Sequence, residues 1–279
     1  MPNILAFCCS THNCSVALLT GEHRQGKGNL ADLEANCTEL SVCRKRSHHR
    51  LIMPMIDRLL TEANISPTEL DSIVCDLGPG SFVGVRIAIG VAQGIGYANS
   101  LKVIGITSLE ILAVKMLTNW RAANATNERI ASAKESSSDY DGEIGIISML
   151  DSKPGEVYWA YYHASKHLSN TNDAGLLKEV IPPTVGSIQD INISSEIPIL
   201  VCGGKRENVD AVANKLRHNS EIISCQYETM PSAKYLLQAA MPRWAGGMDH
   251  AADVSQLRPV YLSAGVQSRA QQKVLPSLK

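Results

Sequence analysis

The residues best suited to chemistry in this sequence are glycines and carboxylates that directly follow apolar, strand-like stretches. Asp76 follows the stretch 72–75, and the run Gly78-Pro79-Gly80-Ser81-Phe82-Val83-Gly84-Val85-Arg86 leads from it into a long apolar segment. Glycines relieve the steric limits on the backbone, and a helix that begins there presents free N–H groups to anions. The run therefore predicts either a phosphate or carboxylate site, or a tight strand-to-helix turn packed against a neighbouring backbone.

Neither standard nucleotide motif fits this run. No Lys-Ser or Lys-Thr pair follows its last glycine, as a P-loop requires, and the spacing differs from the dinucleotide fingerprint. Asp76 and Asp151 both end predicted strands, on opposite sides of a predicted cleft, where carboxylates could hold a metal-bound nucleotide. Turn-forming aspartates are equally common at strand ends, so both interpretations stay open.

The histidines and cysteines give weaker indications of a metal or catalytic site. His163 and His167 stand four apart, a metal-binding spacing on a helix, but they follow a predicted strand, where the side-chain period is two. His48 and His49 are adjacent and are predicted to be solvated near a helix start. The eight cysteines form no Cys-x-x-Cys pair, which predicts free and mostly buried thiols in a reducing compartment.

Length and composition indicate a globular chain with two lobes. The 279 residues are 44% hydrophobic, which is enough for sizeable cores. The chain has 26 Lys and Arg residues and 27 Asp and Glu residues, so its net charge is close to zero. This balance excludes a strongly basic surface for nucleic acid. The N-terminus lacks the pattern of a signal peptide, and no stretch approaches the roughly 20 apolar residues of a membrane span. A cytoplasmic location is expected.

Hydrophobic periodicity divides the chain into two α/β units. In the first, strands are predicted at 3–7, 14–20, 38–43, 72–75 and 102–106, and helices at 50–64, from 66, and at 81–98. In the second, helices are predicted at 108–117, 207–217 and 231–244, and strands at 143–150, 156–162 and 199–202. The polar stretches 21–37 and 119–141 are predicted as a hairpin excursion and a mobile loop. The element order suggests a ribonuclease-H-like first lobe over 1–107, with a second lobe over 108–279.

Several of these segments together resemble the bacterial TsaB family, also called YeaZ. The resemblance rests on the run from Gly78 to Arg86 and on similar segments at 4–6, 14–18, 48, 54–55, 105–109, 155–160 and 259–262. It covers most of the chain apart from the two polar excursions. It implies an α/β fold with two ribonuclease-H-like lobes of the actin-like and sugar-kinase-like (ASKHA) kind.

The resemblance also implies a role in forming threonylcarbamoyladenosine in tRNAs that read codons beginning with A. In that system TsaB is the non-catalytic partner that binds and stabilises its paralogue TsaD, and the ATPase TsaE is a third component. The chain would need no cofactor of its own, because ATP or ADP and the metal belong to the partner subunits. A homodimer is an alternative assembly, tRNA would be reached through the complex, and no membrane contact is expected.

Residue by residue, the resemblance implies that the metal site of TsaD is lost. Its His-x-x-x-His ligands align with Ser108 and Leu112, and neither is an imidazole. The family's usual strand-end aspartate in the first hairpin is Cys8 here, which argues against metal-assisted binding of phosphates. The candidates for residues near a bound nucleotide are Gly78, Gly80, Asp151, Gly203 and Gly204.

An interface with TsaD, or a competing homodimer interface, is predicted on the two helices of the first lobe. Its candidate residues are Met55, Leu59, Arg86, Ile89 and Gln93. Gly90 and Gly94 would allow close helix approach, although a self-contained core would also explain them. The alternative function is an independent enzyme of the same superfamily, metallopeptidase-like or ATP-using. The missing histidine pair argues against the first and Cys8 against the second.

Overall fold

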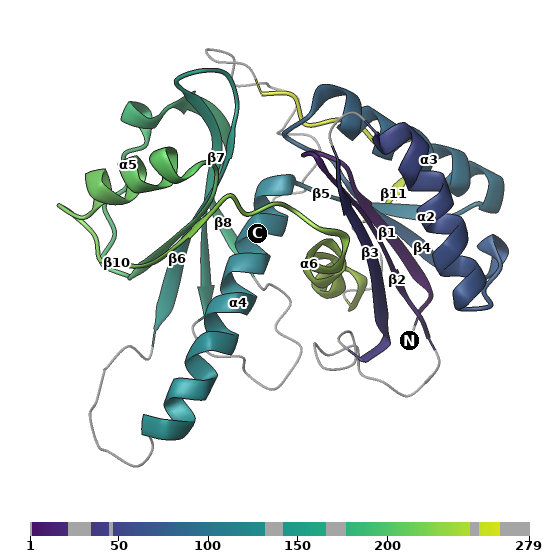
Figure 1. The fold of residues 1–279 in the computed structure, drawn as a ribbon, viewed down its shortest axis with the longest axis horizontal. Helices are drawn as coiled ribbons and strands as arrows, with labels where there is room; N and C mark the ends of the chain where they lie inside the picture. Colours follow the sequence, from purple (N-terminus) through teal and green to yellow (C-terminus); the bar gives the residue numbers. More distant parts are fainter. Residues whose placement is uncertain are drawn as a thin grey trace.

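The computed structural model describes residues 2–21, 35–44, 47–131, 142–165, 177–245 and 251–262. Within them the chain forms two lobes, each built on one mixed β-sheet (Figure 1). The first sheet has six strands in the order β11-β5-β4-β1-β2-β3, and the second has five in the order β10-β9-β6-β7-β8. This is the two-lobed α/β architecture expected from the sequence.

The first sheet combines an antiparallel hairpin with parallel strands. Its strands are β1 (Ile4–Cys8), β2 (Asn13–Leu19), β3 (Cys37–Cys43), β4 (Ser72–Asp76), β5 (Lys102–Ile106) and β11 (Ala252–Asp253). β1 pairs antiparallel with β2 and parallel with β4, so the carboxyl ends of β1 and β4 meet at one edge. Residues of β1 alternate between the two faces, with Leu5 and Phe7 in one core cluster and Ile4 and Ala6 in another.

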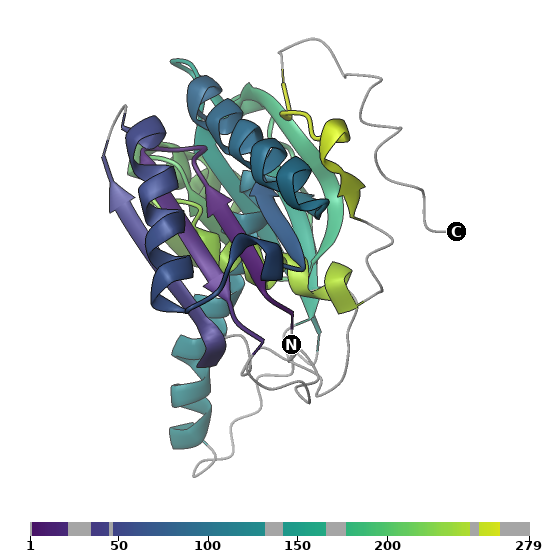
Figure 2. The ribbon, with the colours of Figure 1, turned by 90° about the vertical axis from the view of Figure 1, so that its right-hand side faces the viewer.

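Two helices cover the outer face of the first sheet (Figure 2). They are α2 (His48–Glu62) and α3 (Phe82–Asn99), and the short helix η1 (Pro67–Glu69) lies between them in sequence. η1 begins with the capping box that Ser66 and Glu69 predict. α3 begins after Ser81, whose hydroxyl accepts the N–H of Gly84 at 3.2 Å, and ends at Ser100 in the left-handed region.

The second sheet consists of β6 (Glu143–Asp151), β7 (Glu156–Ser165), β8 (Lys178–Ser187), β9 (Ile199–Gly203) and β10 (Ile222–Tyr227). Helix α5 (Arg206–Leu216) covers its outer face, and η2 (Ile188–Asp190) follows β8. Helix α4 (Ser108–Ala131) covers its inner face. β8 and β10 were not predicted. Two prolines break the β pattern of β8, and β10 is a half-buried edge strand, so neither has a clear period of two.

Helices α4 and α6 (Ala233–Ala245) lie between the two sheets (Figure 1). α4 contributes Ile111 and Val114 to the core of the first lobe and Leu109 and Leu112 to that of the second. The prediction of a loop at 119–141 is wrong for 119–131, which complete α4; residues 132–141 lie outside the described part of the chain. Polar contacts with α6 lie at the start of this part of α4, because Gln238 donates to Thr118 at 2.8 Å and the hydroxyl of Tyr235 donates to Asn119 at 3.1 Å.

The C-terminal segment returns to the first lobe. α6 packs against β1, β2 and β4, and β11 pairs antiparallel with β5, followed by η3 (Val254–Gln256). A boundary at residue 107, with all of 108–279 in the second lobe, does not account for these contacts. β11 could not be predicted, because a two-residue strand carries no periodic signal. The excursion predicted at 21–37 falls mainly on 22–34, outside the described residues.

Candidate functional site

The carboxyl ends of β1 and β4 meet at a fully buried carboxylate, Asp76. Its Oδ1 accepts the hydroxyl of Ser108 at 2.6 Å and the backbone N–H of Gly78 at 2.9 Å. Its Oδ2 accepts the thiol of Cys8 at 2.7 Å. We call Asp76, Cys8, Ser108 and Gly78 the strand-end network. Because both oxygens have donors from within the chain, Asp76 joins β1, the glycine loop and α4 rather than facing a ligand.

Cys8 enters this network as a neutral donor. It is fully buried, and both burial and the Asp76 carboxylate raise the pKa of its thiol well above the ordinary value. A thiol that keeps its proton cannot replace an aspartate in binding a metal-bound phosphate. The position at which the resemblance implies an aspartate therefore holds a hydrogen-bond donor directed at Asp76.

The glycine loop packs against the turn between β1 and β2. A Cβ at Gly80 would collide with the carbonyl oxygen of Ser10, and one at Gly84 with that of Cys9. Gly80 has φ of +155°, and the N–H of Ser81 donates to the carbonyl of Ser10 at 2.6 Å. These contacts match the second interpretation of the run, a tight strand-to-helix turn held against a neighbouring backbone.

The strand ends of the second lobe bring Asp151, Gly203 and Gly204 together. The N–H of Gly204 donates to the carbonyl of Met149 at 3.0 Å, and a Cβ at Gly203 would collide with the same oxygen. Asp151 is exposed, and its Oδ1 accepts the side-chain amide of Asn208 at 2.7 Å and the N–H of Lys205 at 3.3 Å. The five nucleotide candidates thus divide into two groups, Gly78 with Gly80 on one sheet and the other three on the second.

The start of α6 is attached to the inner face of the first sheet. Ser15 accepts the N–H of Ala233 at 2.9 Å, and Glu39 accepts the N–H of Lys234 at 3.0 Å. Asn13 donates to the carbonyl of Pro231 at 3.2 Å. A helix N-terminus that could bind an anion is therefore satisfied by side chains of β2 and β3. The sequence showed the helix but gave no signal for these partners, which lie about two hundred positions away.

The described residues contain no group of three or more His, Cys, Asp or Glu side chains arranged to hold a metal ion. Leu112 lies fully buried in the core between α4 and the second sheet. His163 contacts Glu143 and the hydroxyl of Tyr161, each at 3.1 Å, while His167 lies outside the described residues. Nor does any described helix have the length and apolar character to cross a membrane.

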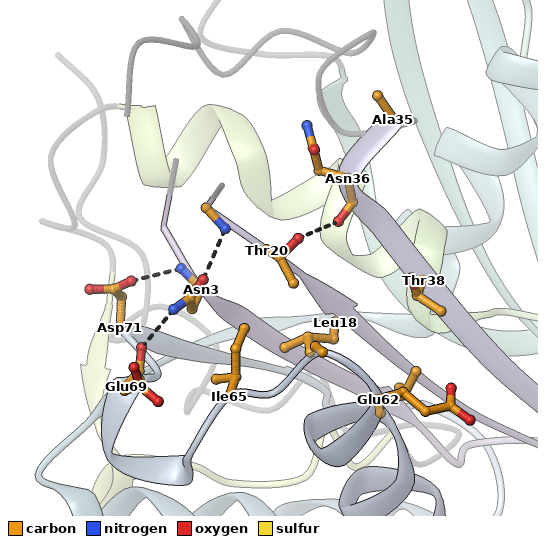
Figure 3. A pocket seen from close by; sticks show the side chains of 13 residues that line it. Asn3, Leu18, Thr20, Ala35, Asn36, Thr38, Glu62, Ile65, Glu69 and Asp71 are labelled. Atoms are coloured by element: carbon orange, nitrogen blue, oxygen red, sulfur yellow. Dashed lines mark hydrogen bonds between the residues drawn. The ribbon is translucent and has the colours of Figure 1, made fainter. Parts of the chain in front are cut away.

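A cavity of about 740 Å³ lies at the opposite end of the first sheet, between β2, β3 and the end of α2 (Figure 3). Asp71 accepts the backbone N–H of Asn3 at 2.7 Å, and Asn3 donates to the carbonyl of Glu69 at 3.0 Å. Glu62 pairs with Arg58 at 2.7 Å. The Glu69 side chain accepts the N–H of Ser66 at 2.8 Å, so the acidic side chains described in this lining are engaged in local structure.

The predicted interface residues divide by burial. Met55, Leu59 and Ile89 belong to the core between the outer helices and the first sheet, so they cannot form a surface. Their helical period marked a buried face, and the prediction did not separate core from interface. Gln93 is half-buried and donates to the carbonyl of Val254 at 3.2 Å. Arg86 is exposed.

The outward face of α2 and α3 carries apolar residues that the sequence did not single out. Among the described residues, the large apolar side chains most open to solvent include Met53, Phe82, Val83 and Tyr97, all on these helices. Arg86 stacks on Phe82, with its guanidinium carbon 3.2 Å from the ring centroid, and also faces Tyr261. Gly90 and Gly94 lie on the open side, because an added Cβ at either would meet no atom within 4 Å.

Comparison with known proteins shows which proteins this chain is similar to. The family profile described as "TsaD: tRNA N6-adenosine threonylcarbamoyltransferase" matches residues 43–174. The tRNA threonylcarbamoyladenosine biosynthesis protein TsaB of Haemophilus influenzae is 26% identical over 93% of this chain and 92% of its own length. The Escherichia coli protein of that name is 32% identical over 59% of this chain and 56% of its own length. The solved structure of YeaZ from Pseudomonas aeruginosa matches 94% of this chain and all of its own, with 25% identity and a TM-score of 0.66.

The two sheets, with α4 and α6 between them, define a two-lobed α/β protein of the ASKHA class to which YeaZ and TsaD structures belong. Relatives named TsaB match over most of the chain, and the structural match to YeaZ extends over nearly all of it. The chain is therefore similar to TsaB (YeaZ) proteins over nearly all of its length.

Proposed function

We propose that this chain takes part in the biosynthesis of threonylcarbamoyladenosine in tRNA, as the non-catalytic partner that binds and stabilises a TsaD-type transferase. The names of the curated relatives supply the pathway. The match of the transferase family profile to residues 43–174 supports a common origin with that enzyme. The target would be tRNAs that read codons beginning with A, reached through the complex.

The strand-end network is the observation that carries the non-catalytic role. A carboxylate that acts on a metal or a substrate must have a free oxygen, whereas both oxygens of Asp76 are engaged by Cys8, Ser108 and Gly78. Replacement of the two metal-ligand positions by Ser108 and Leu112 is consistent with this role. We therefore expect no metal or nucleotide of its own, with ATP or ADP and metal on TsaD and TsaE.

The partner surface in this proposal is the outward face of α2 and α3. Exposed Met53, Val83 and Tyr97 supply apolar area, and Arg86 is held by its stack on Phe82. Aromatic residues and arginine are enriched among the residues that dominate interface energies. Exposed Gly90 and Gly94 would let a partner helix approach closely. A homodimer would use the same face and so compete with TsaD.

A reconstituted modification assay tests the role. TsaD, TsaE, the adenylate-forming enzyme, tRNA, threonine, bicarbonate and ATP are combined with and without this chain, and the modified nucleoside is measured by mass spectrometry. Modification should depend on the chain and should persist with the Asp151→Ala variant. Equal modification without the chain would contradict the proposal.

A binding experiment tests the surface separately. Tyr97→Glu and Arg86→Glu should weaken TsaD binding at least about tenfold, since each places a carboxylate where an apolar or cationic group would be desolvated. The matched control is Val180→Glu, which changes an exposed apolar residue of β8 in the other lobe. Unfolding curves should show all three variants folded. Equal affinity for all three would exclude this face.

A further inference from the structure

The turn between β1 and β2 holds two cysteine side chains in contact. The Sγ atoms of Cys9 and Cys14 are 3.7 Å apart. The register of the hairpin pairs Cys8 with Ser15, so Cys9 and Cys14 stand directly opposite each other one position nearer the turn. Directly opposed residues on antiparallel strands have Cβ atoms about 4.5–5.5 Å apart, close to the spacing of about 3.5–4.5 Å in disulfides.

The pair lies just below a surface turn. Both thiols are buried among the apolar residues under α3, but Thr11 is half-buried and His12, at the turn, is exposed. Both cysteines are fully buried, so oxidation in the folded chain would require the turn at Thr11 and His12 to open. The backbone of Cys9 also lies against α3, because its carbonyl oxygen lies where a side chain at Gly84 would begin.

We infer that Cys9 and Cys14 are an oxidation site that closes to an intramolecular disulfide when a hydroperoxide reaches it. One thiolate attacks a peroxide oxygen, the O–O bond breaks, and the products are a sulfenic acid and, after protonation, one water. The second sulfur then attacks the sulfenic sulfur, forms the S–S bond and releases the second water. Two thiols lose two electrons in total, and one hydrogen peroxide is reduced to two waters.

Either sulfur atom can donate the hydrogen bond within the pair, so either thiol can react first. The cysteine that forms the sulfenic acid is then resolved by the other. In a reducing compartment the disulfide would be transient, since thiol reductants reverse it.

Peptide mass spectrometry on the full chain tests the inference. The reduced protein is treated with graded hydrogen peroxide under native conditions, quenched with catalase, unfolded and alkylated with N-ethylmaleimide. The peptide with Cys9 and Cys14 should lose two hydrogens, escape alkylation at both positions and recover on treatment with dithiothreitol. Exposed Cys43 reports the dose of oxidant that reached the protein.

Variants separate this pair from its neighbours. Cys14→Ser should abolish the disulfide, whereas Cys8→Ser should leave it intact, because a serine hydroxyl can still donate to Asp76. Oxidation of Cys43 while both Cys9 and Cys14 remain alkylatable would overturn the inference. So would a disulfide that persists in Cys14→Ser, since the bond would then join other cysteines. The wild-type measurement decides the question even if a variant fails to fold.

Discussion

The two lobes end their central strands with the same residue type in different surroundings. At the end of β4, Asp76 is fully buried and accepts three hydrogen bonds that join three segments of the chain. At the end of β6, Asp151 is exposed and accepts two hydrogen bonds from the start of α5. The first carboxylate holds the lobe together, while the second caps one helix. Burial and existing partners, more than residue type or topology, decide what a strand-end aspartate does.

The largest loss of stability is expected on substitution of Asp76. Asp76→Ala leaves the buried donors of Ser108, Cys8 and Gly78 without an acceptor, so the free energy of unfolding should fall by about 4 kcal/mol. Urea unfolding followed by circular dichroism measures the loss. Asp76→Asn keeps one acceptor oxygen and should lose less. A loss for Asp76→Ala no larger than that for Asp151→Ala would contradict the distinction between the two strand ends.

A second prediction concerns the clamp between the glycine loop and the β1–β2 turn. Gly84→Ala should destabilise the chain by about 2 kcal/mol, because its Cβ would meet the fixed carbonyl oxygen of Cys9. Gly90→Ala is the matched control on the same helix. Its Cβ would enter open space, so helix propensity alone should stabilise the chain by about 0.5–1 kcal/mol. Thermal unfolding of both variants tests the pair, and equal shifts in one direction would contradict it.

Much of the fold could be predicted because the periodic pattern is local. The strand at 102–106 was placed correctly, and α2, α3 and β4 were placed within two residues, since each is a mainly apolar segment next to Gly, Pro, Ser or Asn residues that mark turns and helix ends. The strands without such a pattern, β8, β10 and β11, were missed. The continuation of α4 beyond residue 117 was also missed, because it is polar and its first residues, Thr118 and Asn119, make hydrogen bonds to α6 that have no local sequence signal.

The candidate site was harder to predict because its partners are distant in sequence. Asp76 was recognised as a strand-end carboxylate, but its donors include Cys8 and Ser108, 68 and 32 positions away. The periodic residues Met55, Leu59 and Ile89 marked the inner faces of the two helices. Exposed Val83 and Tyr97 were visible only once the structure showed which faces of the helices the sheet covers.

A third prediction concerns Asp151, the strand-end aspartate of the second lobe. Asp151→Ala should reduce the free energy of unfolding by less than about 1 kcal/mol, because Asn208 and the N–H of Lys205 can bond to water instead. The same variant should leave TsaD binding unchanged, since Asp151 lies on the other lobe from α2 and α3. Titration of labelled TsaD measures the affinity. A large loss in either quantity would give Asp151 a role beyond capping α5.

The smallest expected effect is a pH dependence confined to the first lobe. His48 is buried at the start of α2, and burial lowers the pKa of its imidazole, opposed in part by the carbonyls of Thr11 and Asn13. The unfolded chain takes up a proton as the pH falls below about 6.5, while the folded ring stays neutral over a lower range. Stability associated with His48 is therefore complete above that pH and declines below it.

Replacement by glutamine should remove this dependence. The free energy of unfolding of His48→Gln should change less between pH 7 and about pH 5 than that of the wild type, a window set by the ordinary histidine pKa. His49→Gln is the matched control, because His49 is exposed at the next position of the same helix. The same pH profile for the two variants would contradict the prediction, because His48 could then be protonated in the folded chain as readily as in the unfolded chain. Asp76 and its donors would then be the part of this end of the first lobe that excludes solvent.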